Sequence, residues 1–154
     1  MQLQALDLKL PPPVIAFVCG GLMWGVAEAV PLLAIVAMPD NIAMVFAGVG
    51  VMIALVAVIS FMLSRTTINP HRPDQTSHLV TSGLYRFSRN PMYLAVFLML
   101  VSWGFWLQNI AAILLLPLFP LYITEFQIKP EEKHLEQLFG KRYREYCSRV
   151  RRWF

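Results

Sequence analysis

Two short polar segments hold the residues best suited to chemistry. The first ends in Arg89 and Asn90, directly before an apolar stretch. Backbone N–H groups at such a helix start, together with an arginine, suit an anionic group such as a carboxylate. The second segment contains Glu131 and Glu132, which follow Pro130. Acidic residues after a proline also favour the start of a helix, so helix initiation and catalysis both explain the two glutamates.

The first segment, the loop 64–91, is unusual for a connection between two helices. Most connections have about 2–8 residues, and longer ones tend to be functional or disordered. This loop also carries aromatic and branched apolar side chains such as Phe87, which disordered linkers lack. Gly83 permits a tight turn, and Asn90 stands where a helix N-cap would lie, before Pro91. We therefore expect a folded element that lies against the membrane.

The elements that must position these segments are membrane spans. Of the 154 residues 57% are hydrophobic and 14% are charged, whereas soluble domains carry about 25% charged residues. A span needs about 20 predominantly apolar helical residues. The apolar stretches predict four spans, at about 14–36, 42–63, 92–107 and 110–126. The first should kink at Pro31, and the last two meet at the polar corner Gln108-Asn109.

Lysine and arginine predict the orientation. The loop 64–91 holds four arginines and the tail after Phe126 holds eight basic residues, while the connections 37–41 and 108–109 hold none. Positive charge marks the cytoplasmic side. The sequence thus predicts an all-α integral membrane protein, one domain over residues 1–154, with about four transmembrane helices and both termini in the cytoplasm. We expect it in the bacterial inner membrane, with its active site on the cytoplasmic side.

The tail predicts a C-terminal amphipathic helix on the membrane surface. Its apolar residues recur at helical spacing. They are Leu135, Leu138, Phe139, Tyr146 and Val150. The terminal stretch Arg149–Trp153 is expected to be a solvated, positively charged anchor. The net charge of +4 then favours the lipid bilayer as partner, and we expect neither nucleic acid nor a metal.

The order of motifs resembles a known family. Leu79-Val-Thr-Ser-Gly-Leu-Tyr85 and Arg89-Asn-Pro-Met-Tyr93 precede an apolar hairpin, and Glu131-Glu-x-x-Leu135 and Tyr143-x-x-Tyr146 follow it. This pattern is similar to the isoprenylcysteine carboxyl methyltransferases, which belong with the phospholipid methyltransferases in a broader membrane group. The resemblance covers about residues 65–150, and the first two spans carry no recognisable motif.

The resemblance implies S-adenosylmethionine as cofactor, bound at the cytoplasmic ends of the last spans beneath the C-terminal segment. The positions that match cofactor contacts are Ser77, His78, Leu79, Val80, Gly83, Tyr85, Asn90, Pro91, Met92, Tyr93, Glu131 and Glu132. Arg89 and Glu131 are the implied catalytic residues, with Glu131 accepting the methionine ammonium and Arg89 holding the carboxylates of the site. Methyl transfer needs an oriented nucleophile in a pocket shielded from water, and no metal.

Two departures concern the substrate. Asn90 stands where the family commonly has histidine, and an amide cannot become cationic. Gln127 stands where the prenylcysteine enzymes have an arginine for the substrate carboxylate, so we expect Gln127 at the substrate. Glu28, an acidic residue inside the first span, is a further substrate candidate. The implied acceptor is small or lipid-like and presents a carboxylate, thiol or amine from the bilayer. His134 is expected to be solvated.

Two alternatives stay open. A membrane reductase of the sterol-reductase type has similar C-terminal helices, but it needs a nicotinamide cofactor. A degenerate family member that acts as a non-catalytic membrane binding protein would keep the fold and lack the reaction. Ligand binding separates the three interpretations.

Overall fold

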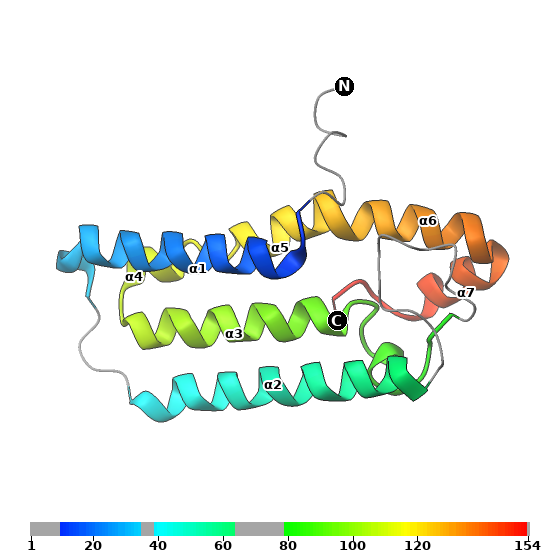
Figure 1. The fold of residues 1–154 in the computed structure, drawn as a ribbon, viewed down its shortest axis with the longest axis horizontal. Helices are drawn as coiled ribbons and strands as arrows, with labels where there is room; N and C mark the ends of the chain where they lie inside the picture. Colours follow the sequence, from blue (N-terminus) through cyan, green and yellow to red (C-terminus); the bar gives the residue numbers. More distant parts are fainter. Residues whose placement is uncertain (1–9, 35–38, 64–78, 154) are drawn as a thin grey trace, which may run out of the picture.

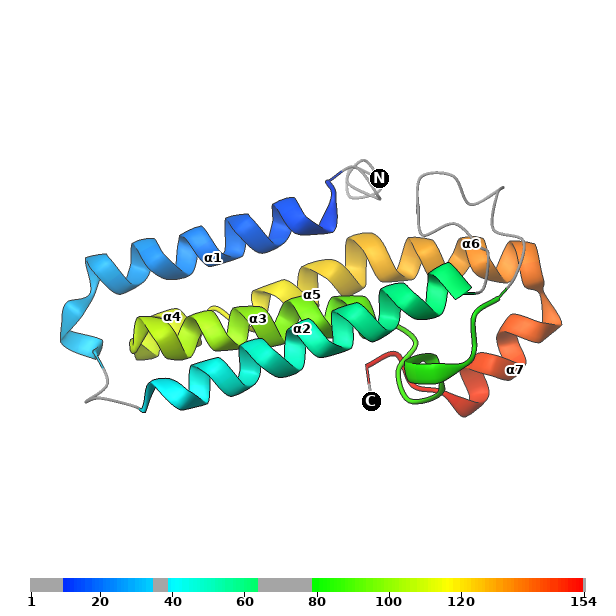
Figure 2. The ribbon, with the colours of Figure 1, turned by 60° about the horizontal axis from the view of Figure 1, so that its bottom comes forward.

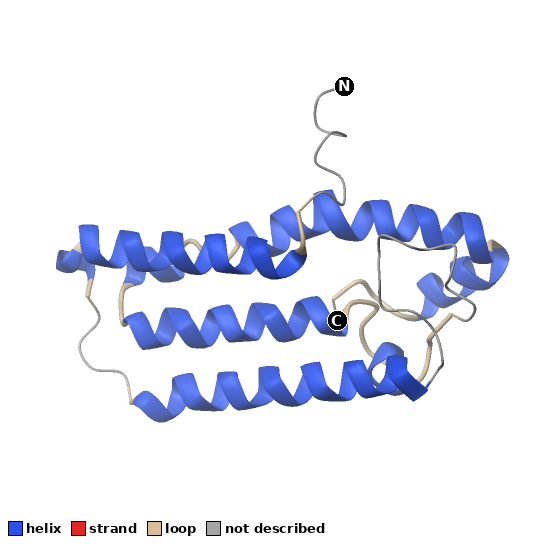
Figure 3. Ribbon diagram, viewed as in Figure 1, coloured by secondary structure: helices blue, strands red, loops and turns tan. Residues whose placement is uncertain are grey.

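The computed structural model describes residues 10–34, 39–63 and 79–153, so Ser77, His78 and most of the loop 64–91 lie outside the described residues. The described parts are helices and loops, with one isolated bridge between Ala34 and Asn109 (Figure 3). The elements are α1 (Pro12–Ala29), a 3₁₀ helix (Pro31–Leu33), α2 (Asp40–Leu63), a second 3₁₀ helix (Gly83–Arg86), α3 (Pro91–Leu107), α4 (Ile110–Ile113), α5 (Leu118–Ile123), a π-helical turn (Thr124–Ile128), α6 (Lys129–Phe139) and α7 (Lys141–Arg149).

Three stretches are long and apolar enough to cross a membrane: Pro12–Ala29, Asn41–Leu63 and Ile110–Phe139. The shorter apolar helix α3 has 17 residues, which at 1.5 Å each gives about 25 Å. The all-helical, membrane-protein part of the prediction is therefore confirmed. The number of four spans and the cytoplasmic termini stay predictions.

Helix α3 lies between α1 and α2 (Figure 1). Small residues allow the close approach of α2, because a Cβ on Gly50 would lie only 3.0 Å from the carbonyl oxygen of Ala95. Close backbone packing on small residues is common between membrane helices. Ser102 of α3 donates a 2.7 Å hydrogen bond to the carbonyl of Ala43, and the rings of Phe46 and Phe105 stack with centroids 5.3 Å apart.

Polar side chains tie α1 to the far end of α3. Trp103 donates through Nε1 to the carbonyl of Gly20 at 3.1 Å. Asn109 is almost fully buried, donates to the carbonyl of Val30 at 2.9 Å, and accepts from the first N–H groups of α4. The predicted polar corner is thus confirmed, with Gln108 in the left-handed conformation at φ 48°.

The first span does not kink at Pro31 as predicted. Helix α1 ends at Ala29, and Pro31 begins a separate 3₁₀ helix. The reason is local, because a residue before proline is pushed away from helical backbone angles, and Val30 has φ −126° and ψ 63°. The fourth predicted span is also interrupted, since α4 ends at Ile113 and α5 begins after Pro117.

Helix α6 begins at Lys129 with Pro130 in its first turn, as the sequence indicates, but the chain before it is already helical. Pro130 lies inside a continuous helical path, one residue into α6, and a π-helical turn precedes it. In that turn the N–H of Lys129 donates to the carbonyl of Thr124, five residues back. A wider turn removes the clash between a proline ring and the carbonyl four residues earlier, which in a regular helix breaks the path.

The single amphipathic helix predicted for the tail is two helices. Gly140 has φ 50° and ψ −118°, a conformation open mainly to glycine, and it ends α6 and begins α7. Helix α6 extends past the end of α3, and α7 turns back beside it (Figure 2). The apolar side of α7 packs inward, with Tyr143, Tyr146 and Val150 buried against Leu79 and the α6 residues Leu135 and Phe139.

Candidate functional site

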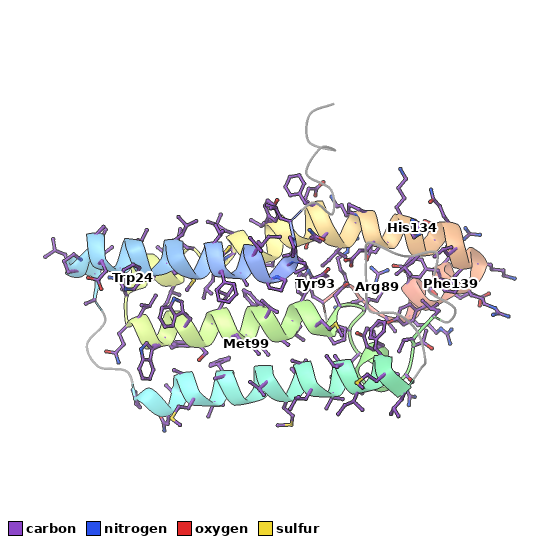
Figure 4. All side chains as sticks on the ribbon, in the orientation of Figure 1. Trp24, Arg89, Tyr93, Met99, His134 and Phe139 are labelled. Carbon is purple, nitrogen blue, oxygen red and sulfur yellow. The ribbon has the colours of Figure 1, made fainter. Side chains whose placement is uncertain are left out.

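The first turns of α3 and α6 are joined by a short hydrogen bond. Tyr93 donates from its hydroxyl to Oε1 of Glu131 at 2.6 Å. Tyr93 and Arg89 lie at the end of the helix bundle from which α6 projects, with His134 and Phe139 farther along α6 (Figure 4). The structure thus brings together the two segments that the sequence singles out.

Glu131 lies beyond the apolar part of its helix. The candidate span Ile110–Phe139 has 30 residues, about 45 Å, against a hydrocarbon core of about 30 Å. Its last eleven residues, α6, carry five of the charged side chains and project from the bundle. Burial raises the pKa of Glu131 to about 7, and the nearby Glu132 raises it further, while the Tyr93 hydrogen bond opposes the shift. Near neutral pH this carboxyl gains or loses its proton readily.

Glu132 has very different surroundings. Arg89 approaches its Oε1 to 3.0 Å, and Arg152 grips both oxygens, through Nε at 3.0 Å and Nη2 at 2.7 Å. The side chains of Glu132 and Arg89 are 17% and 14% exposed, so this cluster is mostly removed from water. Forked pairs of this kind are among the stronger charged hydrogen bonds. Glu132 is thus neutralised by two arginines, whereas among the described residues Glu131 has no cationic partner.

The C-terminal segment returns to the start of α3. The main-chain N–H of Arg89 donates to the carbonyl of Arg151 at 3.0 Å, and the side-chain amide of Asn90 donates to the carbonyl of Arg152 at 3.0 Å. The N–H of Asn90 donates to Ser88 Oγ at 3.2 Å. Asn90 does occupy the predicted N-cap position of α3, without a side-chain cap bond. The N–H groups of Arg89 and Asn90 therefore already have protein partners.

This return also corrects the expectation for the terminal stretch Arg149–Trp153. It is not simply a solvated anchor, because Arg152 is held in the ion pair and Trp153 packs against the main hydrophobic core. Hydrogen bonding to Glu132 raises the pKa of Arg152 above its ordinary value, so the pair stays charged at physiological pH.

Helix α7 closes the other side of the loop. Tyr146 is buried and donates to the carbonyl of Tyr85 at 2.7 Å. Arg89 donates from Nη1 to Sγ of Cys147. Burial raises the pKa of Tyr85, Tyr143 and Tyr146, so all three phenols stay protonated. Arg89 therefore binds three separate parts of the chain: Glu132, Cys147 and the backbone of Arg151.

Two buried nitrogens have no hydrogen-bond partner among the described residues, Nε of Arg89 and Nε2 of His134. His134 is therefore half-buried rather than solvated, contrary to the expectation. Buried polar atoms normally find a partner, and an orphan in a native structure needs an explanation. The unpartnered Nε belongs to the arginine that binds Glu132, and it is a candidate donor to a ligand.

Several other predicted cofactor positions, in the loop and at the start of α3, pack against α2 and α7. Val80 and Tyr85 form a buried cluster with Ala57 of α2, against which Met92 packs. Leu79 packs on α7, and Pro91 is buried as the first residue of α3. Gly83 has φ 60°, which confirms the tight turn expected there.

The two predicted substrate residues lie elsewhere. Gln127 is 1% exposed and donates to the carbonyl of Leu10 at 2.7 Å, one helical turn before Glu131. Glu28 is exposed at the far end of α1, sixteen residues from Pro12 and thus about 24 Å away along the helix. The structure does not bring Glu28 to the cluster.

An apolar groove begins beside Gln127. It has a volume of about 470 Å³ and runs between α1 and α5. Its walls are Leu10, Val14, Ile15, Val18, Cys19, Leu22, Leu118, Leu121, Tyr122 and Phe126. The groove thus extends to Phe126, five residues before Glu131 in the chain.

Sequence reasoning missed Arg152 and Cys147 at the site. Arg152 ends a run of basic residues, a pattern that is usually solvated, and Cys147 belongs to no motif. No signal in the sequence identifies either residue, since both reach Arg89 and Glu132 only because Gly140 turns the chain back. Tyr146 carried a signal, as part of the Tyr-x-x-Tyr motif.

Comparisons with known proteins show the family of the chain. The profile of the phospholipid methyltransferase family matches residues 39–142, about two thirds of the chain. A 62-residue stretch, 40% of the chain, is 48% identical to an uncharacterised protein of Haemophilus influenzae and covers 98% of that protein. The protein-S-isoprenylcysteine O-methyltransferase B of Arabidopsis thaliana is 31% identical over 112 residues, 72% of this chain and 56% of that enzyme. No solved structure matches the chain significantly.

The matched range covers α2, the loop before α3, α3 itself, α4 to α6 and the first residues of α7. It includes Arg89, Tyr93, Glu131 and Glu132, and it excludes α1 and Arg152. The chain spans only about half of the Arabidopsis enzyme. With apolar helices able to cross a membrane and a profile that matches most of its length, the chain belongs to the phospholipid methyltransferase family of membrane methyltransferases.

Proposed function

We propose that this protein transfers a methyl group from S-adenosylmethionine to a lipid-like acceptor that enters from the bilayer. The observation that carries the proposal is the contrast between the two adjacent glutamates. Glu132 is neutralised by Arg89 and Arg152, while Glu131 is half-buried, accepts a hydrogen bond from Tyr93 and has no cationic partner among the described residues. A carboxylate that is partly removed from water and lacks a cation suits a ligand that brings one.

The residues present fit the amino-acid end of this cofactor. The Glu131 carboxylate would accept the ammonium group, and the buried, unpartnered Nε of Arg89 would donate to the carboxylate. Tyr93 holds Glu131 in place from α3. The bound cofactor supplies an electrophilic methyl group on its sulfonium. The protein's task is then to orient the acceptor and to exclude water, which suits a site closed by α7 and the C-terminal segment.

The groove between α1 and α5 suits the hydrocarbon part of the acceptor. Its volume of about 470 Å³ lies within the range of about 300–1,000 Å³ typical of ligand sites, and its walls are almost entirely apolar. Leu10, which lines the groove, accepts the hydrogen bond from Gln127, four residues before Glu131. A chain in this groove would bring a carboxylate, thiol or amine head group toward the cofactor. We place the site on the cytoplasmic side of the bacterial inner membrane, where the basic tail lies.

Binding of S-adenosylhomocysteine to purified protein in detergent, measured by calorimetry, tests the proposal. We expect saturable binding by the unaltered protein and a loss of at least about tenfold in Glu131→Gln, because a charged hydrogen bond is removed. Glu136→Gln is the matched control, since Glu136 lies on the same helix but is exposed. Absence of binding by the unaltered protein, or equal affinity of the two variants, would contradict the proposal.

The same preparation separates the alternatives. A reduced nicotinamide cofactor that binds in place of S-adenosylhomocysteine would favour the reductase. Binding of neither compound would favour a non-catalytic membrane protein. Membranes incubated with methyl-labelled S-adenosylmethionine, then extracted into lipid and protein fractions, identify the acceptor class.

A further inference from the structure

The last residues of the described chain make unusually specific contacts for a terminal segment. Arg152 lies 20 positions after Glu132 and binds both of its carboxylate oxygens in a fork, at 2.7 and 3.0 Å. Arginine presents two parallel N–H groups that match a carboxylate, a geometry that lysine cannot copy. Arg152 is 33% exposed and Glu132 is 17% exposed, so the pair is partly shielded from water.

The backbone of the same segment is bound as well. The carbonyl of Arg152 accepts from the side chain of Asn90 at 3.0 Å and from Ser88 Oγ at 3.4 Å. The carbonyl of Arg151 accepts from the main chain of Arg89 at 3.0 Å. Trp153 then packs against the main core. The segment is thereby fixed to the loop before α3 with its backbone and to α6 with the Arg152 side chain.

These contacts determine what the two glutamates can do. Neighbouring residues on a helix project about 100° apart, so the direction of Glu132 sets the direction of Glu131. Arg89 and Arg152 together hold Glu132 in place from two separate parts of the chain. With Glu132 occupied, Glu131 faces Tyr93 and remains the carboxylate available to a ligand.

We propose that Arg152 is a positioning residue of the cofactor site: by gripping Glu132 from the C-terminal segment it aligns Arg89 and Glu131 for the amino-acid end of the cofactor. This inference rests on the proposed function. It goes beyond the family match, because Arg152 lies outside the matched residues 39–142. The site is then complete only while the segment 150–153 lies against the start of α3.

The test compares four full-length proteins in detergent, the unaltered chain, Arg152→Gln, Arg152→Lys and Arg149→Gln. Arg149 is the matched control, since it lies three positions away, carries the same charge and is exposed. S-adenosylhomocysteine affinity is measured by calorimetry at a temperature at which circular dichroism shows every variant folded. We expect Arg152→Gln to weaken binding about tenfold, Arg152→Lys to restore part of the loss, and Arg149→Gln to stay within about twofold.

A second measurement separates positioning from general stabilisation. In a protein that already carries Glu132→Gln, adding Arg152→Gln should weaken S-adenosylhomocysteine binding only a little further. The reason is that the two residues act through one contact, which the first change has already removed. A lower melting temperature for Arg152→Gln with unchanged affinity would show a merely structural role and overturn the inference. If Glu131→Gln abolishes binding while Arg152→Gln binds normally, the inference alone fails. If the unaltered protein does not bind, the proposed function fails, and the inference with it.

Discussion

Tyr93 and Glu131 stand 38 positions apart in the chain, yet the phenolic oxygen of Tyr93 lies 2.6 Å from Oε1 of Glu131. The bond joins the first turn of α3 to α6, across the whole hairpin of α3, α4 and α5. It holds the one carboxylate of the site that has no arginine partner among the described residues. The position of Glu131 therefore depends on residues from both polar segments.

Removing this bond should change how cofactor binding depends on pH. The Tyr93 hydrogen bond lowers the pKa of Glu131, so Tyr93→Phe should raise it further. We expect the variant to bind S-adenosylhomocysteine several-fold more weakly at pH 7, with the difference narrowing by about pH 9 as the carboxyl ionises. Calorimetry across this range is the measurement. A constant difference at every pH would show that Tyr93 acts through packing instead.

Glu131 should also make stability and binding respond to pH in opposite directions. Its pKa is raised from the ordinary 4.5 to about 7 by burial. Between these values the folded protein holds a proton that the unfolded chain has lost, so this group's contribution to stability falls as pH rises through the window. Affinity for the cofactor ammonium should rise over the same window, because the ionised carboxylate binds it.

Melting temperatures with and without S-adenosylhomocysteine, measured from about pH 5 to pH 8, check both trends. In Glu131→Gln both dependences should flatten, because an amide does not titrate. A melting curve for the unaltered protein that matches this variant at every pH would contradict the assignment.

Gln127 should matter for the fold more than for the acceptor. Its amide donates to the carbonyl of Leu10 and is fully buried. Gln127→Ala should cost about 1–3 kcal/mol, because it leaves a carbonyl without a partner beside a small cavity. Thermal unfolding measures the loss, and Gln137→Ala, at an exposed position of α6, should change it little. Equal stability of the two variants would contradict this role.

Filling the groove should reduce methyl transfer to the acceptor without changing the affinity for the cofactor. Cys19 lines the groove between α1 and α5, so Cys19→Trp should fill part of its volume of about 470 Å³. We expect methyl transfer to the lipid fraction to fall at least about tenfold while S-adenosylhomocysteine affinity stays unchanged. Leu32→Trp, at a position that is 95% exposed, is the control. Normal transfer by Cys19→Trp would show that the acceptor enters elsewhere.

The bend between α6 and α7 should be required for the site. Gly140→Ala places a Cβ on a residue with φ 50° and ψ −118°, which costs on the order of 1–3 kcal/mol. Since this bend brings α7 and Arg152 back to Arg89, cofactor affinity should fall together with stability. Gly21→Ala, in the open face of α1, should leave both unchanged or slightly improved. Calorimetry and thermal unfolding give the two readings.

Much of the fold follows from hydropathy alone. The apolar stretches predicted α2 and α3 within two residues of their observed starts, because lipid demands about 20 consecutive apolar helical residues whatever their neighbours. Asn109 and Gly83 also occupy the predicted corner and turn, since both signals are local. The prediction failed at Pro31, where α1 ends instead of kinking. A proline can end, start or interrupt a helix, and only the surrounding backbone decides which.

The sequence singled out some residues of the candidate site but not which of them pair with one another. Arg89 and Glu131 stand out by type and position, and the structure brings their segments together. Which glutamate binds which arginine depends on how far α6 is rotated about its own axis. No local sequence pattern specifies that rotation. The role of Arg152 depends on the reversal of the chain at Gly140, far from the residues it contacts.

The π-helical turn Thr124–Ile128 lies between α5 and α6. It changes the direction in which the side chains of α6 project relative to those of α5. Each residue of an α-helix turns the chain by about 100° around the helix axis. The wide turn contains one extra residue, so the helix after it is rotated relative to a regular α-helix. If this turn wound into a regular helix, α6 would swing by about a quarter-turn and Glu131 would leave Tyr93. Pro130, which a regular helix would not tolerate there, holds the turn open. The π-helical turn thus sets the direction in which the two glutamates project relative to the residues of α5.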